Sequence, residues 1–340
     1  MVQQGVPDNV SEEYYQISES ILGSFPKYRP PLDLFALNEK VAQLIPYSRK
    51  GARLSNEQVE EVAALCSEGN LFVARSDHHI YSKHIVKQLD LILVDKNLKQ
   101  GEIVGVCIDA MRQRVHDFLE QPVKNQFDLL DTDLKVVTEY LWQDRYRFKL
   151  FLKNLWAGNH SLVNHSTNCL FVGMWLLNEM KGKDLTRKML DDAAFALLTH
   201  DVGMSKIPSF ILNKTKPLTP DEKSKIPPHV MVSAAIIRKL DVASDIVDQV
   251  VLQHHERLDG SGYPQRTKDL SFWGKLSAVV DSFSAMIQTR PHAPAKDMAT
   301  AARELGADRT LYDTACSGGI LAGMVNNLFS VVDSEPSSGS

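Results

Sequence analysis

The sequence predicts a small α+β domain followed by an all-α domain, and three observations favour this fold class. The chain has 340 residues, which is more than one domain usually needs. Between residues 32 and 118, short apolar runs of strand type are mixed with a helical segment. From residue 158 to about 328, every substantial segment has apolar residues spaced at i, i+3 or i+4.

Composition excludes several classes of protein. Hydrophobic residues make up 44% of the chain and charged residues 24%, a balance that argues against a mostly disordered or fibrous chain. The formal net charge of −4 is not that of a protein that binds nucleic-acid polymers. Four scattered cysteines are too few for a disulfide framework or a cysteine-type zinc site. Without a membrane-spanning stretch or a secretory signal, we expect a cytoplasmic protein that does not contact membranes.

The first third of the chain is expected to hold an N-terminal arm (1–31) and an α+β accessory domain (32–123). Ser55 is a plausible N-cap for a helix that ends near Gly69, with glutamates in its first turn. Strands are predicted on the run 33–46, at 71–74, and around residues 89–93, where leucines alternate with their neighbours.

The remainder of the chain is predicted to be helical. Residues 124–157 carry apolar residues at helical spacing and contain no glycine or proline, which indicates a long helix or helix pair joining the two domains. The domain 158–330 follows, with helices expected at 170–180, 185–198, 231–240, 246–254, 274–287 and 299–305. The tail 331–340 is mostly Ser, Pro and Gly, and we expect it to be disordered.

Histidines and aspartates of the second domain form a candidate metal site. Imidazole nitrogens and carboxylate oxygens from several rigid elements are what a divalent transition metal requires. Five histidines and two aspartates are too many ligands for one ion and about right for two. The candidates are His165, His200, Asp201, His229, His254, His255 and Asp281.

Context separates the dipeptide His200-Asp201 from similar pairs elsewhere. It ends an apolar helix, where polar side chains would be costly to bury unless something binds them. The pair His116-Asp117 lies in a polar context, and His78-His79 follows a polar turn, so neither is predicted to bind metal.

The segment that starts at His254 is the most specific motif. It reads HHERLDGSGYP through Pro264, with two glycines and a proline that shape a tight loop after a histidine pair. This HHExxDGxGYP pattern, with an upstream His-Asp pair and a downstream aspartate, resembles the HD-GYP family of cyclic di-GMP phosphodiesterases, within the HD superfamily of metal-dependent phosphohydrolases. The resemblance covers residues 158–328.

The resemblance implies an all-helical HD-type bundle around a cluster of metal ions, most often iron or manganese. It assigns all seven candidates as ligands, with His200 and Asp201 at the catalytic centre and Asp201 as the bridging carboxylate. The substrate would be cyclic di-GMP or a related cyclic dinucleotide, opened by a water that two ions activate. Gly262 and Tyr263 belong to the loop that shapes the substrate side, and Arg290 matches a conserved basic segment of the family.

Three positions depart from the family pattern. Family members with a third ion carry a glutamate four residues before the first histidine, but here that residue is Ser161, so we expect two ions. The lysine that meets a substrate phosphate in the family is Met204. The basic segment keeps Arg290 but loses its second cation.

Other cations could replace the missing lysine. Residues 204–240 carry seven basic residues and two acidic ones, so their net charge is +5. Either this segment is a solvated loop, or Lys206, two residues beyond Met204, reaches a phosphate.

Two other functions remain open. The first is a cyclic dinucleotide receptor or interaction platform with little turnover, which Met204 favours and the complete ligand set opposes. The second is an HD-superfamily phosphohydrolase acting on nucleotide mono- or triphosphates, which leaves the loop 254–264 unexplained. The first domain is expected to be regulatory or to bind a protein partner or a second copy.

Overall fold

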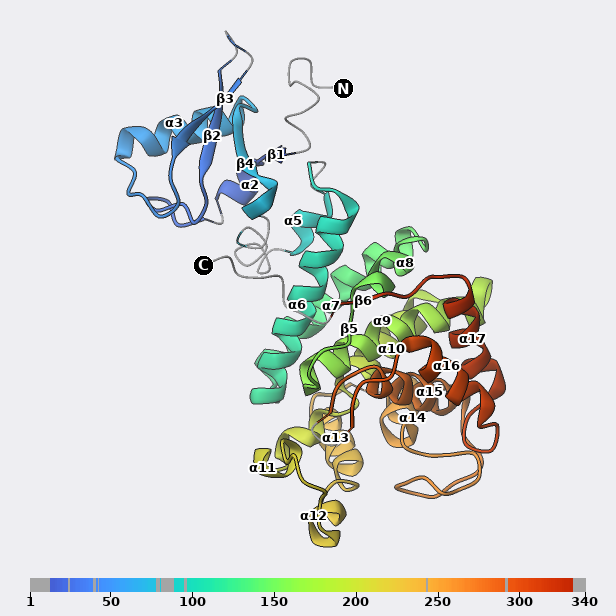
Figure 1. Ribbon diagram of the computed structural model, residues 1–340. Coiled ribbons are helices and arrows are strands. Elements are labelled where there is room, and N and C mark those ends of the chain that lie inside the picture. The colour runs from blue at the N-terminus through green and yellow to red at the C-terminus, as the bar shows by residue number, and fades with distance from the viewer. Residues whose placement is uncertain are drawn as a thin grey trace. The chain divides into compact units, whose positions relative to one another are not determined.

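The computed structural model describes residues 13–332 except 24, 39–40, 42, 78–79, 81–88, 95–96, 243 and 291–292. The chain divides into two compact units, 1–110 and 111–340 (Figure 1). The predicted arrangement, a small α+β part followed by a mainly helical part, is confirmed. The domain boundaries expected from sequence stay predictions, since the units divide inside one continuous helix, α6 (Gln100–Glu120).

The N-terminal unit is built on a four-stranded antiparallel sheet. Its strand order is β1-β4-β2-β3, formed by β1 (Tyr14–Gln16), β2 (Leu34–Asn38), β3 (Gln43–Ser48) and β4 (Leu71–Ala74). Helix α3 (Asn56–Ser67) begins at a capping box, in which the Ser55 hydroxyl accepts from the Gln58 amide and the Gln58 side chain accepts from the Ser55 amide. Val62 of this helix and Leu34 and Leu71 of the sheet are buried in the unit's core.

Three local predictions for this unit need correction. Residues 14–22, expected to be part of an arm, form β1 and the short helix α2 (Glu19–Leu22). Residues 89–94, expected to be a strand, form helix α5 (Leu89–Val94). The physical reason is that Leu89 and Ile92, three residues apart and thus on one helical face, are the buried pair. Helix α6 was not predicted at all.

The helical unit places four of its helices in a ring. Helix α10 (Arg187–Thr199) packs on α9 (Leu162–Lys181) and α14 (Asp245–Gln253), and α15 (Phe272–Met286) packs on the same two partners. All four predictions of these helices are confirmed. Apolar side chains such as Leu170, Leu197, Val250 and Val279 fill the interior and are almost completely buried.

The other elements of this unit surround the ring. The expected helix pair is present as α7 (Lys124–Gln143) and α8 (Arg147–Phe151). Strands β5 (Leu155–Trp156) and β6 (Val331–Val332) form a short parallel pair. Strand β6 is the first part of the predicted tail 331–340, and the other residues of the tail lie outside the described residues. The further helices are α11 (Ser209–Leu212), α12 (Pro220–Ser224), α13 (His229–Arg238), α16 (Met298–Ala307) and α17 (Thr314–Val325).

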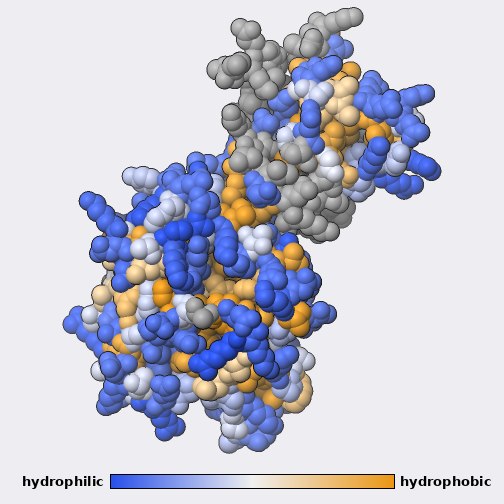
Figure 2. All heavy atoms as spheres, turned by 180° about the vertical axis from the view of Figure 1, so that it is seen from behind, coloured by the Kyte–Doolittle hydropathy of each residue, from blue (hydrophilic) through white to orange (hydrophobic). Residues whose placement is uncertain are grey.

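None of the helices among the described residues is both long and apolar enough to cross a bilayer. Figure 2 shows a mainly hydrophilic face on the helical unit, with apolar residues between the polar ones.

A buried ion pair anchors the end of α6 to α7. Arg114 Nε lies 2.5 Å from Asp133 Oδ2, and both side chains are largely buried. Replacing Asp133→Ala should lower the free energy of unfolding by about 3 kcal/mol, because it leaves the largely buried Arg114 guanidinium without its ion-pair partner. Asp131→Ala on the same helix removes an exposed pair with Lys135 and should cost about 0.5 kcal/mol or less. Equilibrium urea denaturation distinguishes these outcomes, and equal losses would contradict the anchoring role.

Candidate metal centre and cavity

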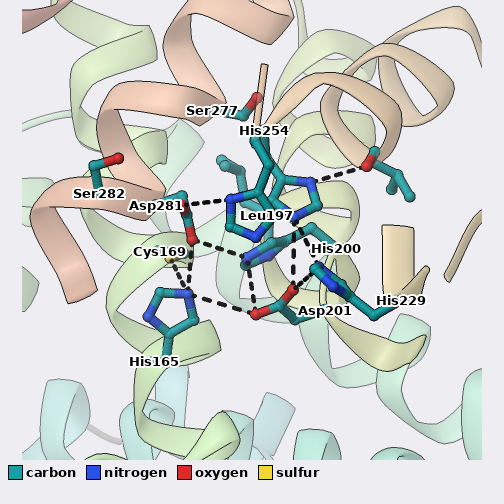
Figure 3. Close-up of polar contacts among 12 residues, drawn as sticks. His165, Cys169, Leu197, His200, Asp201, His229, His254, Ser277, Asp281 and Ser282 are labelled. Carbon is teal, nitrogen blue, oxygen red and sulfur yellow. Dashed lines mark hydrogen bonds and ion pairs between the residues drawn. The ribbon is translucent and has the colours of Figure 1, made fainter. Parts of the chain in front are cut away.

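The structure brings the seven predicted ligands to one place inside the helical unit (Figure 3). Helix α9 supplies His165, the end of α10 supplies His200 and Asp201, and the first residue of α13 is His229. His254 and His255 follow α14 directly, and Asp281 lies on α15. All seven side chains are buried except His255, which is partly exposed.

A glycine allows the segment after Asp201 to reach α13. A Cβ on Gly203 would lie 2.2 Å from the His229 carbonyl oxygen and 2.7 Å from the Ser233 nitrogen. The Gly203 amide donates to the Ser233 hydroxyl at 2.8 Å. This close backbone approach holds Asp201 beside His229, so a residue with a side chain at position 203 would separate them.

The donor atoms form two groups. The first consists of His165, Cys169, His200 and Asp281, and the second of Asp201, His229, His254 and His255. Within each group, every donor atom lies within 4.8 Å of the others. The potential donors therefore form two neighbouring groups of four.

The Asp201 carboxylate lies between the two groups. Its Oδ2 is 3.8 Å from His165 Nε2 and 3.7 Å from His200 Nε2. Its Oδ1 is 3.0 Å from His229 Nε2 and 3.6 Å from His254 Nε2. One oxygen thus faces each group, which is the geometry that a bridging carboxylate needs.

Asp281 is arranged in a similar way. Its Oδ1 lies 3.1 Å from His165 Nε2 and 3.7 Å from His200 Nε2, and its Oδ2 lies 3.5 Å from His255 Nδ1. Both carboxylates therefore contact histidines that belong to the two groups.

Backbone carbonyls set the tautomers of three histidines. The Nδ1 atoms of His200, His229 and His254 lie 2.7–2.9 Å from the carbonyl oxygens of Leu197, Ile226 and Val251, each three residues earlier. Because a carbonyl only accepts, each Nδ1 carries the proton in the neutral ring, and each Nε2 presents its lone pair to the cluster. Metal-binding histidines are typically held in this way.

Burial and charge act against each other on these groups. Burial lowers the pKa values of His254 and His255 and favours their neutral, metal-binding form. Burial would also lower the pKa of His200, but the Asp201 and Asp281 carboxylates outweigh it and raise that pKa to about 9. Burial would raise the pKa of Asp201, yet His200 and His229 hold it well below its ordinary value. Both aspartates are therefore ionised near neutral pH.

These residues fit a divalent metal ion. The His200 Nε2 atom is buried without a hydrogen-bond partner, and it faces two carboxylates. Burying five imidazoles and two carboxylates at one point would be costly without a cation to bind them. The donor set of nitrogens and oxygens is typical of divalent transition metals.

A cavity of about 600 Å³ opens onto the cluster. Tyr263 and Arg290, predicted to contact substrate, line it together with Met204. Lys206 is exposed and Gly262 is buried, and neither is among the lining residues. A phosphate contact by Lys206 therefore stays a prediction. The two residues that follow Arg290 lie outside the described residues.

Two buried residues hold the loop that carries Tyr263. A Cβ on Gly262 would lie 2.4–2.6 Å from backbone atoms of His255, Glu256 and Arg257, so the loop packs directly on that backbone. The fully buried Glu256 accepts hydrogen bonds from the amides of Gln265 and Arg266, at 2.6 and 3.0 Å. The Tyr263 ring packs against His255 with a centroid distance of 4.7 Å.

Sequence reasoning missed several residues of the site. Cys169 belongs to the first donor group. Its position one helical turn after His165, on the same face of the helix, is the signal that could have identified it. Glu256 lies within the segment 254–264, but the sequence pattern alone did not indicate its role in holding the loop. His116, set aside as an accidental His-Asp pair, lines the cavity together with Leu119 and Glu120 of α6. No signal in the sequence indicates that this preceding helix reaches the cavity. His78 and His79 lie outside the described residues.

Comparisons with known proteins agree with this geometry. Residues 157–316 match a family model described as HD domain. The chain is 30% identical over 205 residues to a cyclic di-GMP phosphodiesterase of Thermotoga maritima, covering 58% of this chain and 55% of that protein. It is 32% identical over 124 residues to a cyclic di-GMP phosphodiesterase of Pseudomonas aeruginosa, covering 36% and 30% of the two chains. The chain thus spans about half the length, or less, of these curated relatives.

Two further similarities are informative. A 3'3'-cGAMP-specific phosphodiesterase of Vibrio cholerae is 34% identical over 90 residues, which are 26% of this chain and 17% of that protein. Among solved structures, Bd1817, an HDG"Y"P protein from Bdellovibrio bacteriovorus, aligns with a TM-score of 0.60 at 13% identity, covering 92% of this chain and 100% of that one. This second match shows a shared fold.

Replacing Gly262→Ala should destabilise the protein, because the added carbon overlaps backbone atoms that have no room to move. We expect a loss of about 2 kcal/mol, typical of overpacking. Gly306→Ala in α16 is the matched control, since the nearest atom to its Cβ would be 3.9 Å away. That variant should be neutral or more stable, because alanine favours helix. Scanning calorimetry measures both, and an unchanged Tm for Gly262→Ala would refute the packing argument.

Proposed function

We propose that the helical unit, which matches an HD domain model over residues 157–316, is of the HD-GYP family and that the protein is a metal-dependent phosphodiesterase. It hydrolyses cyclic di-GMP, or a related cyclic dinucleotide, to the linear dinucleotide. The observation that carries the proposal is the Asp201 carboxylate, with one oxygen facing each of two donor groups at the end of a cavity of about 600 Å³. Cavities of this size are typical of small-molecule sites.

The five histidines and two aspartates would hold two divalent transition-metal ions, iron or manganese. The two donor groups support the number two. Ser161 also supports two ions over three. Its hydroxyl accepts from the Asn164 amide at 3.1 Å and caps α9, so this position holds a helix cap in place of the carboxylate that would bind a third ion. Two such ions, when bound, supply a hydroxide nucleophile near neutral pH and neutralise charge on a phosphate.

The protein's own residues position this chemistry. The five histidines and two aspartates hold the donor atoms rigidly, since they come from five separate helical elements. Arg290 lines the cavity, and its Nε is buried without a hydrogen-bond partner, so the guanidinium is available to a substrate phosphate. Tyr263, packed on His255, forms the wall beside the second donor group.

The N-terminal unit is proposed to regulate the helical unit or to bind a protein partner or a second copy, as the sequence led us to expect. The substrate is the small cyclic dinucleotide rather than a nucleic-acid polymer. The cytoplasmic location stays a prediction.

One assay tests the proposed reaction. Purified full-length protein is incubated with Mn²⁺ or Fe²⁺ and with cyclic di-GMP, cyclic di-AMP or the mixed-base cyclic dinucleotide, and the products are separated by chromatography. We expect a linear dinucleotide in the presence of metal and none after chelation. Binding without linear product, with either metal, would contradict hydrolysis and favour the receptor function.

Substituting Asp201→Asn should lower kcat by at least about 100-fold, because the bridging carboxylate loses its charge and both donor groups lose a ligand. Asp117→Asn is the matched control: it also follows a histidine, but its carboxylate accepts from Gln113 and lies 3.9 Å from His116, both on the same helix, and it belongs to neither donor group. Metal content by mass spectrometry accompanies the rates. Equal activity of the two variants would refute the assignment of Asp201.

Met204→Lys should tighten binding of the cyclic dinucleotide about tenfold. Met204 lines the cavity, and a charged hydrogen bond to phosphate contributes about 1.5 kcal/mol. Isothermal titration calorimetry at two salt concentrations measures the gain, which should shrink as salt increases. Lys206→Ala should change the affinity less, because Lys206 does not line the cavity. No gain for Met204→Lys would show that no phosphate lies near position 204.

A further inference from the structure

Cys169 lies inside the metal cluster. It is on α9, one helical turn after His165 and on the same face, and it is 1% exposed. Its Sγ lies 3.5 Å from His165 Nε2, and its donor atom, with those of His165, His200 and Asp281, falls within the 4.8 Å limit of the first donor group (Figure 3). A thiol at this position is close enough to serve as a fourth donor.

The separations match those of donors around one ion. A nitrogen at about 2.1 Å and a sulfur at about 2.3 Å from an ion, about 90–110° apart, are separated by about 3.1–3.6 Å. The observed distance between His165 Nε2 and Cys169 Sγ, 3.5 Å, falls in this range. The distance between His165 Nε2 and Asp281 Oδ1, 3.1 Å, is also that of adjacent donors around one ion.

A second donor in the same group points to a ligand independently. His200 is 2% exposed, its Nδ1 is committed to the Leu197 carbonyl, and its Nε2 has no hydrogen-bond partner. A buried Nε2 atom that faces a thiol and two carboxylates and has no hydrogen-bond partner can serve as a ligand for a cation that takes the place of its proton.

The other three cysteines, all within the described residues, have different surroundings. Cys66 donates to the Ile17 carbonyl oxygen, and Cys316 lies 3.7 Å from the Met180 sulfur. Cys107 is buried in α6 and belongs to neither donor group. Cys169 is therefore distinguished by its neighbours and not by burial, which all four share.

We propose that the Cys169 thiolate ligates the ion that His165, His200 and Asp281 hold. The thiol proton passes to solvent as the metal–sulfur bond forms. Beside the bridging Asp201 carboxylate, the first site then has two nitrogens, the Asp281 oxygen and one sulfur, whereas the second has three nitrogens. Because thiolate is a soft ligand, the first site favours softer ions than the second, and the two sites of one centre differ in metal preference. The proposal depends on the metal binding of the proposed function but not on hydrolysis.

Metal spectroscopy of the full-length protein tests this ligand. Metal-free protein is titrated with Co²⁺ and, separately, with Cd²⁺, and bound metal is counted by mass spectrometry. Wild type should show a thiolate-to-metal charge-transfer band in the near-ultraviolet, complete after the first site fills. Cys169→Val and Cys169→Ser should lack the band and bind the ion of the first site more than about tenfold more weakly. Removing only the hydrogen-bond partner of a metal ligand typically lowers metal affinity by at least that factor.

Cys316→Ser is the matched control, because it removes a buried thiol outside both donor groups. It should keep the band and the affinity, and circular dichroism shows that each variant is folded. The proposal is overturned when ions bind to wild type without a thiolate band, or when both Cys169 variants keep wild-type affinity and spectrum. Failure of the proposed function has a different signature: no ion binds to wild type at either site, or ions bind with a thiolate band but no linear dinucleotide forms.

Discussion

The contact of the Asp201 carboxylate with four histidines is the constraint on which the helical unit depends. Its two oxygens lie 3.0–3.8 Å from imidazole nitrogens contributed by α9, the end of α10, the start of α13 and the end of α14. Four elements distant in sequence must therefore converge to within a few ångströms. The ring of α9, α10, α14 and α15 provides this convergence, because its apolar interior sets the position of each helix end.

Close backbone contacts then set the finer positions. Gly203 lets the chain after Asp201 touch the start of α13, and Gly262 lets the Tyr263 loop rest on the backbone that follows His255. Glu256 contributes a buried carboxylate that accepts from two amides of the same loop. Each of these residues lies next to a donor residue in sequence or in space, so the metal centre and the substrate wall share one scaffold.

The sequence predicted the site better than the surroundings of the site. His200-Asp201 could be recognised because polar residues end an apolar helix, and His254–Pro264 because its glycines and proline follow a histidine pair. The alternating leucines at 89–93 were misleading, because residues 89 and 92 form one buried helical face, a pattern too short to separate a helix from a strand. The contribution of α6 to the cavity could not be predicted. His116 and Leu119 reach the cavity through tertiary packing, and the residues around them in the sequence do not indicate that contact.

Charge in the cavity is more restricted than the basic segment 204–240 suggests. Lys214 and Lys225 lie within 2.7 Å of Glu222 and Asp221, and Arg238 lies 3.5 Å from Asp248. Two of the segment's seven basic residues are thus paired with its own two carboxylates, and Asp248 outside the segment offsets one of the five remaining positive charges.

Among the described residues that line the cavity, Arg290 is the one lysine or arginine. An anionic substrate in this cavity would therefore be neutralised by Arg290 and by the metal centre. Met204 adds an uncharged lining residue, so binding strength in this cavity depends on the ions more directly than it would with a lysine at position 204.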